Sequence, residues 1–428
     1  MIETEVCIVG AGPGGAAAAL KLSYLGISCL LLDKATFPRD KVCGDAVSGK
    51  VTTLLGRLDP AMLQRFRQQV TNIDVWGIRF VPSNGRELKI PFKIDYDKQR
   101  DEAPGYVMRR TDFDNFLVEE VRQRKNIDFR EEVEVKQYEQ TTEGWTLTTA
   151  KQEEIRCKIL LVADGAYSHF SRHIAGHTKD NAHYAAALRA YYKGVTGFHE
   201  DNFIELHFLP ELNPGYFWVF PLPDGGANVG LGMRSDFIQK RRLNLREVLE
   251  EVFEKHPDIA ARFANAKLEG KVVGYGLPLG SKRRSLSGDN YMLLGDAGHL
   301  IDPLTGEGIG NAFYSGFIAA EQVQQCLQEQ RFDATYLQAY DVRVDRVLRA
   351  EMRLSYQLQR IMQVQWLTNL ITGFIANNPK IIELLCRMYT DFDLRKQLVR
   401  PWFWLKMWLG GNGSSEMGSR KLEVGREE

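Results

Sequence analysis

The sequence has no excess of charge of either sign, since lysine plus arginine and aspartate plus glutamate each total 55 among 428 residues. No global field would therefore draw the protein onto nucleic acid or strongly anionic lipid, so any membrane attraction must be local. No apolar run is long enough to span a bilayer. The acidic first residues lead into a strand pattern without the basic and apolar parts of a signal peptide, so we expect a cytoplasmic protein.

Close cysteine pairs are also missing. The six cysteines are far apart, so we expect reduced thiols and neither a metal site nor a small disulfide scaffold. No internal repeat stands out. With 44% hydrophobic and 26% charged residues, the composition is that of a globular protein, and the length allows two or three hydrophobic cores.

A pattern of strand, glycine-rich turn and helix opens the chain. Residues 6–9 are apolar, an alanine-rich stretch runs to Leu25, and a second apolar run at residues 28–32 ends in Asp33. The glycines match G-x-G-x-x-G, which lets a pyrophosphate approach a helix N-terminus, and an acidic residue at this spacing accepts hydrogen bonds from a ribose. We expect a dinucleotide, either NAD or FAD, to be bound by Gly10, Gly12, Pro13, Gly14, Gly15, Asp33 and Lys34.

Two later segments follow apolar strand patterns. Ala163-Asp164-Gly165-Ala166 follows residues 159–162, and Gly295-Asp296 follows residues 291–294 and continues to Gly310. Either segment alone would be an ordinary turn. Together with the glycine motif, in this order and spacing, they resemble the para-hydroxybenzoate hydroxylase superfamily of flavoproteins over about residues 3–330.

That resemblance implies non-covalently bound FAD. It implies that Asp296 bonds the ribityl chain, and that the helix N-terminus at residues 306–310 faces the pyrimidine edge of the flavin, where the reduced ring is negative. Residues 110–114 are similar to the family's R-x-x-F-D segment, whose arginine lies near the flavin. The cofactor residues implied in this way are Arg110, Asp164, Gly165, Gly295, Asp296, Gly306, Gly308, Ile309 and Gly310.

Two further segments narrow the resemblance to the geranylgeranyl reductases. Residues 41–48 are similar to the K-x-C-G-x segment of that family, and residues 216–221 to its Y-x-W-x-F-P segment. The first similarity implies that Cys43 and Gly44 lie beside the isoalloxazine ring, with Cys43 as the catalytic candidate. The second implies an apolar cavity for a prenyl chain, lined by Tyr216, Trp218, Phe220 and Pro221.

Several assignments have a plainer alternative. Cys43 alone is compatible with a small buried hydrophobe, and period-two spacing places the aromatic residues of 216–220 on one strand face that a core would also bury. Residues 400–409 hold three of the seven tryptophans beside cationic residues, which suits a peripheral membrane contact. The same segment is compatible with a terminal helix docked on the protein's own core.

The expected architecture is α/β, with a Rossmann-type FAD-binding domain, an inserted antiparallel β-sheet domain for the substrate and a C-terminal helical region. The FAD-binding domain would comprise residues 1–66, 105–183 and 272–330. The substrate domain would comprise residues 67–104 and 184–271. Residues 331–409 would be helical, and residues 410–428 would form a disordered tail.

These patterns predict an FAD-dependent reductase that saturates carbon–carbon double bonds of an isoprenoid chain on a phospholipid, quinone or diphosphate. The protein would exclude water, hold the alkene over flavin N5 and supply a proton, with Cys43 near the proton path. A monooxygenase or halogenase on the same scaffold is the first alternative, and a non-catalytic flavin-binding protein is the second. Because no second dinucleotide fingerprint occurs, NAD(P)H and ferredoxin both remain as electron donors, and the oligomeric state stays open.

Overall fold

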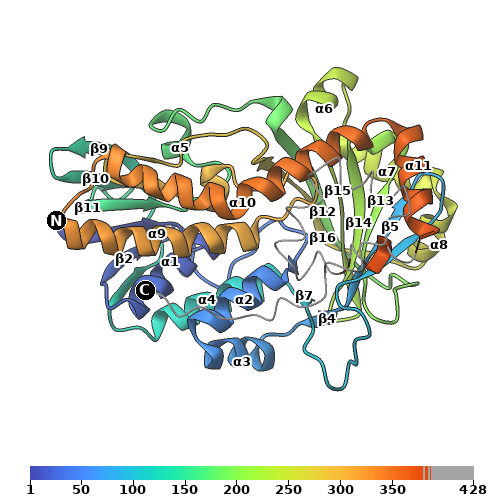
Figure 1. Ribbon diagram of the computed structural model, residues 1–428, viewed down its shortest axis with the longest axis horizontal. Helices are drawn as coiled ribbons and strands as arrows, with labels where there is room; N and C mark the ends of the chain where they lie inside the picture. Colours follow the sequence, from blue (N-terminus) through green and yellow to red (C-terminus); the bar gives the residue numbers. More distant parts are fainter. Residues whose placement is uncertain (379–380, 384–385, 387–428) are drawn as a thin grey trace, which may run out of the picture.

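The first strand of the chain lies inside an eight-stranded mixed sheet (Figure 1). The computed structural model describes residues 1–378, 381–383 and 386. β1 (Ile2–Val9) pairs in parallel with β2 (Cys29–Leu32) and β11 (Glu154–Val162), and their apolar runs are buried. The other strands of this sheet are β8 (Ile127–Arg130), β9 (Val135–Thr141), β10 (Gly144–Thr149), β17 (Ser287–Gly288) and β18 (Tyr291–Leu293).

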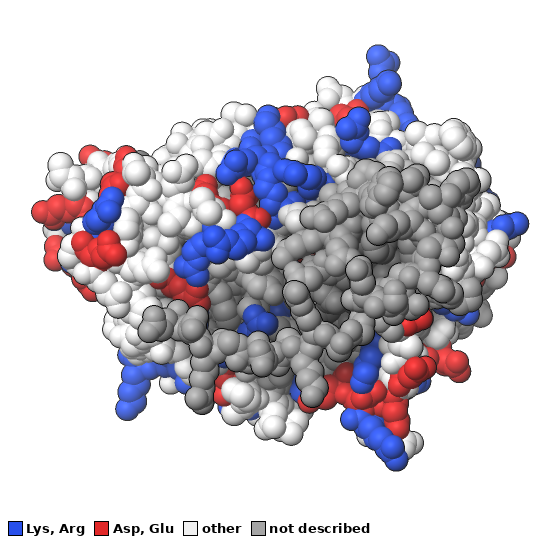
Figure 2. Space-filling view, viewed as in Figure 1, with Lys and Arg blue, Asp and Glu red and all other residues white. Residues whose placement is uncertain are grey.

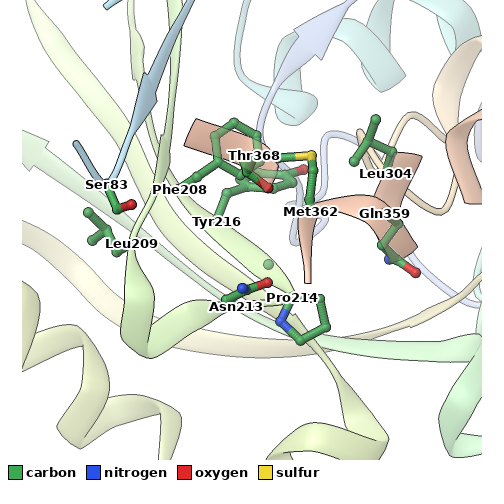
Figure 3. Close-up of a pocket in the computed structure, with 11 residues that line it drawn as sticks. Ser83, Phe208, Leu209, Asn213, Pro214, Tyr216, Leu304, Gln359, Met362 and Thr368 are labelled. Atoms are coloured by element: carbon green, nitrogen blue, oxygen red, sulfur yellow. The ribbon is translucent and has the colours of Figure 1, made fainter. Parts of the chain in front are cut away.

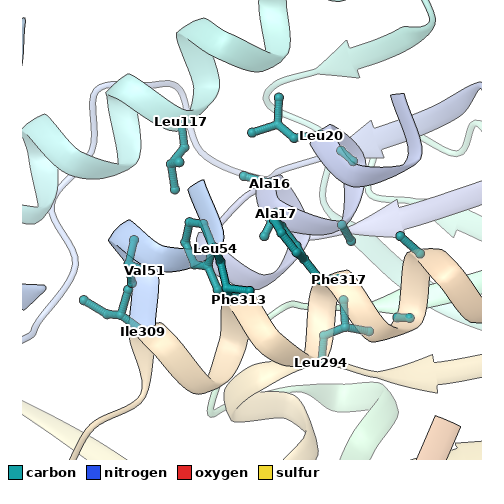
Figure 4. Packing of buried hydrophobic residues seen from close by; sticks show 14 of the residues in the cluster. Ala16, Ala17, Leu20, Val51, Leu54, Leu117, Leu294, Ile309, Phe313 and Phe317 are labelled. Carbon is teal, nitrogen blue, oxygen red and sulfur yellow. The ribbon is translucent and has the colours of Figure 1, made fainter. Parts of the chain in front are cut away.

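Helix α1 (Pro13–Tyr24) connects β1 to β2 and packs closely against α9 (Ile309–Glu329). Gly316 of α9 permits this approach, because a Cβ there would lie 2.5 Å from the carbonyl oxygen of Gly14 in α1. Figure 4 shows Ala17 of α1 grouped with Phe313 of α9 in the main hydrophobic core. The same layer includes α2 (Gly49–Leu58), α3 (Pro60–Gln69) and α4 (Arg110–Arg122).

A seven-stranded sheet collects strands from two separate parts of the chain, in the order β16-β12-β15-β14-β13-β5-β6. The expected insertion is antiparallel at every pairing of these described strands except β13 with β5, which is parallel. Those two strands are separated by more than a hundred residues of chain, so no tight hairpin fixes their relative direction. The strands are β5 (Gly77–Pro82), β6 (Leu88–Pro91), β12 (Tyr184–Lys193), β13 (Ile204–Phe208), β14 (Gly215–Pro221), β15 (Gly226–Arg234) and β16 (Lys267–Pro278).

The two faces of this second sheet are covered differently. On one face, Phe217 and Val219 of β14 pack with apolar residues of α7 (Leu245–Lys255) and α8 (Pro257–Phe263). The opposite face carries a separate apolar cluster. The short elements that join the sheets and helices are α5 (His169–His173), α6 (Ser235–Arg241), η1 (Asn181–His183), η2 (Pro210–Leu212) and η3 (Gly295–Gly298).

A three-stranded sheet of β3 (Ala46–Val47), β7 (Gly105–Val107) and β4 (Ile73–Val75) accompanies the two larger sheets. Val75 and Val107 of this small sheet belong to the apolar cluster on the second face of β14. Because β3 directly follows residues 41–45, this packing brings the Cys43 segment against the seven-stranded sheet. The expected α/β architecture is therefore confirmed.

The C-terminal part begins with α10 (Ala334–Met362), which crosses from the first sheet toward the second (Figure 1). It is followed by α11 (Gln365–Ala376), so the expected helical pattern is present where this region is described. No helix in the described part of the chain is long and apolar enough to cross a membrane. The tryptophan-rich segment 400–409 and residues 410–428 lie outside the described residues.

Candidate active site

The turn between β1 and α1 leaves a helix N-terminus open. Gly12 is the N-cap residue, it makes no side-chain cap, and the first turn of α1 carries no acidic residue. Pro13 occupies the first turn of the helix. The turn is tight, because Gly10 has φ 101° and a Cβ on Gly15 would lie 1.8 Å from the carbonyl oxygen of Gly10. Backbone N–H groups and the positive end of the helix dipole are thus available to a pyrophosphate.

Asp33 closes this turn at the end of β2. Its Oδ2 accepts a hydrogen bond from the Ala11 N–H at 2.7 Å, and its Oδ1 accepts one from Ala35 at 2.8 Å. The residue is buried, so its orientation is fixed, while each carboxylate oxygen keeps a lone pair for a ribose hydroxyl. The neighbouring Lys34 side chain is exposed.

Arg39 stands at the same helix N-terminus, although the sequence patterns did not single it out. Its Nη1 donates to Asp114 Oδ2 at 3.0 Å, and a Cβ on Gly12 would lie 3.6 Å from its Nη2. The predicted cofactor residue Arg110 is buried and donates two hydrogen bonds of 2.7 Å to the same Asp114 carboxylate. One carboxylate therefore orients two guanidinium groups near the pyrophosphate position.

The Asp164-Gly165 turn meets the glycine turn. A Cβ on Gly10 would lie 2.4 Å from the carbonyl oxygen of Ala163, so the two segments are in backbone contact. Gly165 has φ 86°, a conformation that favours glycine. Burial raises the pKa of Asp164 to about 6, and its Oδ1 is buried without a hydrogen-bond partner among the described residues. An unpartnered acceptor at this position fits a polar cofactor.

The loop from Gly295 to Gly310 brings Asp296 to the N-terminus of α9. A Cβ on Gly308, the N-cap residue, would lie 3.4 Å from Asp296 Oδ1, and this cap has no side-chain hydrogen bond. Lys41 Nζ lies 3.8 Å from Asp296 Oδ2. The buried Ile309 then begins the helix, and the Gly310 N–H donates to Glu307 Oε1 at 2.9 Å. The Asp296 carboxylate and the helix N-terminus are thus adjacent.

Close packing fixes two glycines of this loop, Gly295 and Gly306. Gly295 has φ 54°, and a Cβ there would lie 2.9 Å from the Cβ of Ala312 in α9. Gly306 has φ 73°, and a Cβ there would lie 3.1 Å from the Tyr216 hydroxyl. That hydroxyl donates to the carbonyl oxygen of Thr305 at 2.5 Å. Strand β14 is therefore tied directly to the predicted cofactor loop.

Cys43 is half-buried and lies near the predicted cofactor arginine. Burial by itself would lower the pKa of Arg110, but the Asp114 carboxylate and the Cys43 sulfur more than offset that effect and the pKa is raised. The adjacent Gly44 lies flat on β14, because a Cβ there would be 3.0 Å from the Phe220 ring and 3.8 Å from Trp218 Nε1. The residue that follows the thiol thus packs on the aromatic strand, while Cys43 itself packs against the main hydrophobic core.

Asp45 is a fully buried carboxyl beside this thiol. Its Oδ2 accepts hydrogen bonds from the Tyr191 hydroxyl at 2.7 Å and from Asn228 Nδ2 at 2.8 Å. Its Oδ1 is buried without a hydrogen-bond partner in the part of the chain that the structure describes. Burial raises the pKa of Asp45 to about 6. The residue has φ 67°, so the network holds a strained, protonatable group next to Cys43.

Asn228 connects the members of this network. Its Nδ2 also donates to the carbonyl oxygen of Cys43 at 2.7 Å, and its Oδ1 accepts from Trp218 Nε1 at 2.8 Å. Neither Asn228 nor Tyr191 was singled out in the sequence. The only signal for Asn228 is a polar side chain within the otherwise apolar stretch of β15, which becomes informative once the strand is known to be buried.

The aromatic residues of β14 divide between core and pocket. Tyr216, Trp218 and Phe220 lie on one face, as period-two spacing predicted. Trp218 and Phe220 are 7% and 8% exposed and belong to an apolar cluster, and Pro221 at the strand end is also buried. Tyr216 lines a pocket (Figure 3). Of the four predicted cavity residues, Tyr216 lines this pocket, whereas Trp218, Phe220 and Pro221 are not among its described lining residues, and the prenyl cavity stays a prediction.

The pocket at Tyr216 lies between the ends of the second sheet and the C-terminal helices (Figure 3). It contains about 480 Å³ of space not filled by atoms, part of it open to solvent. Most of its lining is apolar. The lining residues are Ser83, Phe208, Leu209, Asn213, Pro214, Gly215, Tyr216, Leu304, Gln359, Met362 and Thr368.

No group of three or more histidine, cysteine, aspartate or glutamate side chains that could hold a metal ion is found among the described residues. No disulfide links Cys7, Cys29, Cys43, Cys157 and Cys326 in the described part of the chain.

Comparison with known proteins identifies one family model, described as an FAD binding domain, that matches residues 3–355. The chain is 29% identical to the menaquinone reductase of Mycobacterium tuberculosis over 326 residues, which is 74% of this chain and 76% of that protein. It is 28% identical to digeranylgeranylglycerophospholipid reductase 2 of Methanopyrus kandleri over 355 residues, 80% of this chain and 82% of that protein.

Solved structures with the same fold include two kinds of protein. A geranylgeranyl bacteriochlorophyll reductase-like protein of Thermoplasma acidophilum has a TM-score of 0.75 at 22% identity, covering 88% of this chain and 92% of its own. A flavin-dependent brominase has a TM-score of 0.73 at 21% identity, covering 90% and 93%. At these identities the likeness concerns the fold, which reductases and halogenases share.

Proposed function

The chain belongs to the FAD-binding-domain family and is an FAD-dependent oxidoreductase, and from this premise we propose that it reduces carbon–carbon double bonds of an isoprenoid chain. The observation that carries the proposal is the packing of the Cys43-Gly44 segment on β14, through the contact of Gly44 with Phe220. The same strand lines the apolar pocket through Tyr216 and contacts the cofactor loop at Thr305. An apolar chain in that pocket would contact Tyr216, whose pKa is raised by burial, Asp302 and Cys43, and Leu304 of the cofactor loop.

The residues of the first sheet fit an FAD. The open N-terminus of α1 and Arg39 would hold the pyrophosphate, Asp33 the adenosine ribose, and Asp296 the ribityl chain. The N-terminus of α9 would face the ring. When bound and reduced, the flavin supplies the hydride.

The apolar pocket would hold the isoprenoid chain and exclude water from it. Phe208, Leu304 and Met362 offer apolar contacts, and the hydroxyl of Tyr216 is already occupied by Thr305. Few polar groups would therefore compete for a substrate that cannot form hydrogen bonds along its chain. The reacting alkene would be positioned by shape.

The proton for the second alkene carbon would come from the Cys43 thiol. The thiolate left behind would face the Arg110 guanidinium, which stabilises the anion. Asn228 Nδ2 donates to both the Cys43 carbonyl oxygen and Asp45 Oδ2, so the backbone that carries the thiol is held in place. One hydride and one proton added to the alkene balance the reduction.

The names of the relatives support this substrate class. Menaquinone and digeranylgeranylglycerophospholipid, which name the two relatives' reductase activities, both carry isoprenoid chains. For this chain we propose a prenylated lipid, quinone or diphosphate, with NAD(P)H or a ferredoxin as electron donor. The halogenase alternative is kept because the brominase has nearly the same fold similarity.

One experiment separates these functions. The FAD-loaded protein would be incubated without oxygen with a prenylated lipid and a strong reductant, and the products examined by mass spectrometry. A reductase gives products heavier by two hydrogens per reduced double bond. A product that carries oxygen or bromine and forms only in air would overturn the proposal in favour of the alternative.

A further inference from the structure

A second pocket lies against the Gly295–Gly298 turn. It is enclosed by that turn, by residues 280–286 and by one face of α10. Figure 2 shows lysine and arginine side chains gathered on this face of the molecule, over the middle of α10. None of the predicted cofactor or substrate residues lines it, so the proposed reaction leaves it without a role.

The lining of this pocket carries more positive than negative charge. Its cations are Lys282, Arg283, Arg284, Arg349 and Arg353, and its carboxylate is Asp345. Arg283 lies 3.0 Å and Arg349 lies 3.7 Å from that one carboxylate. Within the described part of the chain, Arg284 and Arg353 take part in no ion pair. The pocket therefore has a surplus of cationic donors.

Two polar groups inside the pocket are covered but have no partner. Arg284 Nε and Nη2 are buried without a hydrogen bond to any described residue. His299 is 7% exposed, and its Nδ1 likewise has no partner among the described residues. Burial, Arg284 and His177 together lower the pKa of His299 to about 3, so the ring is neutral at pH 7. Buried donors without acceptors are costly unless a ligand satisfies them.

We propose that this pocket binds the phosphate group of a ligand. A phosphate carries one to two negative charges and several acceptor oxygens, which match the forked donors of Arg284 and Arg353. His299 would add a donor from a neutral ring, without adding charge. A single carboxylate would leave part of this cationic surplus unmatched.

The position of the pocket indicates two sources for the phosphate. Tyr356 of α10 lines it, and Gln359 of the same helix lines the apolar pocket, about 5 Å further along the axis at about 1.5 Å per residue. His299 also lies three residues after Asp296. The phosphate therefore belongs either to the prenyl substrate or to the 2′-phosphate of NADPH, an assignment that rests on the proposed function, whereas binding itself does not.

Calorimetry on the full-length, FAD-loaded protein tests the proposal with two matched ligand pairs. Geranylgeranyl diphosphate would be compared with geranylgeraniol, and NADPH with NADH. We expect one pair to differ by at least tenfold in Kd, and inorganic phosphate to compete. In Arg284→Gln and Arg353→Gln the tighter partner should lose at least tenfold, while Arg331→Gln, an exposed site outside the pocket, keeps it.

Each outcome decides the matter independently of turnover. A difference in the diphosphate pair assigns the pocket to the substrate, and a difference in the NADPH pair assigns it to the donor. Equal affinities within both pairs, or a preference that survives Arg284→Gln, would overturn the phosphate site. Thermal unfolding without ligand adds a control: Arg284→Gln should keep or raise Tm because it removes unpaired buried donors, whereas a lowered Tm with unchanged binding would make Arg284 a structural residue.

Discussion

The dinucleotide end and the substrate end of the candidate site are built differently. The dinucleotide end is one tight turn, residues 10–15, closed by the nearby Asp33 through the Ala11 N–H. The substrate end joins Cys43 to Asn228, which lies 185 residues further along the chain, and through it to Trp218. The dinucleotide end depends mainly on the backbone conformation of its glycine turn, whereas the substrate end depends on hydrogen bonds from side chains that are distant in the sequence. Changes at the first should therefore remove the cofactor, and changes at the second should spare it.

The largest effect is expected from Gly12→Val. The nearest atom to a Cβ at this position is Arg39 Nη2 at 3.6 Å, so the folded protein has room for the side chain. A pyrophosphate at the α1 N-terminus would not, and FAD affinity should fall by at least about 100-fold, or about 2.7 kcal/mol. Flavin absorbance per purified protein measures the loss. Gly274→Ala, in the second sheet, should stay yellow, and a yellow Gly12→Val would contradict the assignment of the turn.

Cys43→Ala should have the opposite signature. The variant is expected to retain FAD and to lose about 100-fold or more in turnover of a prenyl substrate, the range for removal of a proton donor. Single-turnover oxidation of the reduced flavin by substrate would measure it. Cys326→Ala, another free cysteine, should leave turnover per bound flavin unchanged. Full activity in Cys43→Ala would remove the thiol from the mechanism and leave the cofactor site intact.

Asp45→Asn examines the substrate end through pH. Burial raises the pKa of Asp45 to about 6 from 3.8, so the folded protein holds this proton more tightly than the unfolded chain. Stability of the wild type should therefore fall as pH rises from about 4 to about 6, by up to about 3 kcal/mol at about 1.4 kcal/mol per pKa unit.

The variant should lack that contribution and be the more stable protein at pH 7.5, as urea unfolding would show. Part of the slope should remain, because the pKa of Asp164 is also raised to about 6 at the dinucleotide end. An Asp45→Asn curve that parallels the wild type at every pH would mean that the carboxyl titrates normally.

The contrast between the two ends also explains what the sequence could predict. The glycine turn and the alternation in β14 depend on neighbours within a few residues and are present in the structure, and Asp33 bonds Ala11 from 22 residues further along the chain. The contact of Gly10 with Ala163 was not predicted, since spacing alone does not say which strands pair, and the family resemblance implied only that both turns bind the cofactor. Local sequence patterns therefore predict the backbone conformation, and the family resemblance indicates which distant segments share one site.

The remaining features depend on tertiary contacts between distant side chains. Arg39 reaches the α1 N-terminus from a loop, and Tyr191 reaches Asp45 from a strand 146 residues away. The parallel pairing of β5 with β13 arises because the two strands belong to separate segments. The cationic pocket could not be predicted for the same reason. Arg284 and Arg353 look like ordinary charged residues in the sequence, and only folding brings them into one pocket and buries part of Arg284. Composition and spacing contain no signal for such meetings.

The smallest effect is expected where the two ends touch. The Tyr216 hydroxyl donates a hydrogen bond to the Thr305 carbonyl oxygen at 2.5 Å. This bond links β14 to the cofactor loop. Tyr216→Phe keeps the ring and removes this bond, which should cost about 1 kcal/mol of stability. Because loop and pocket wall would loosen together, FAD affinity and prenyl turnover should each fall a few-fold, unlike in the other variants. Tyr192→Phe, on the opposite face of the same sheet, should change neither. A loss confined to one measurement would show that the two ends act independently.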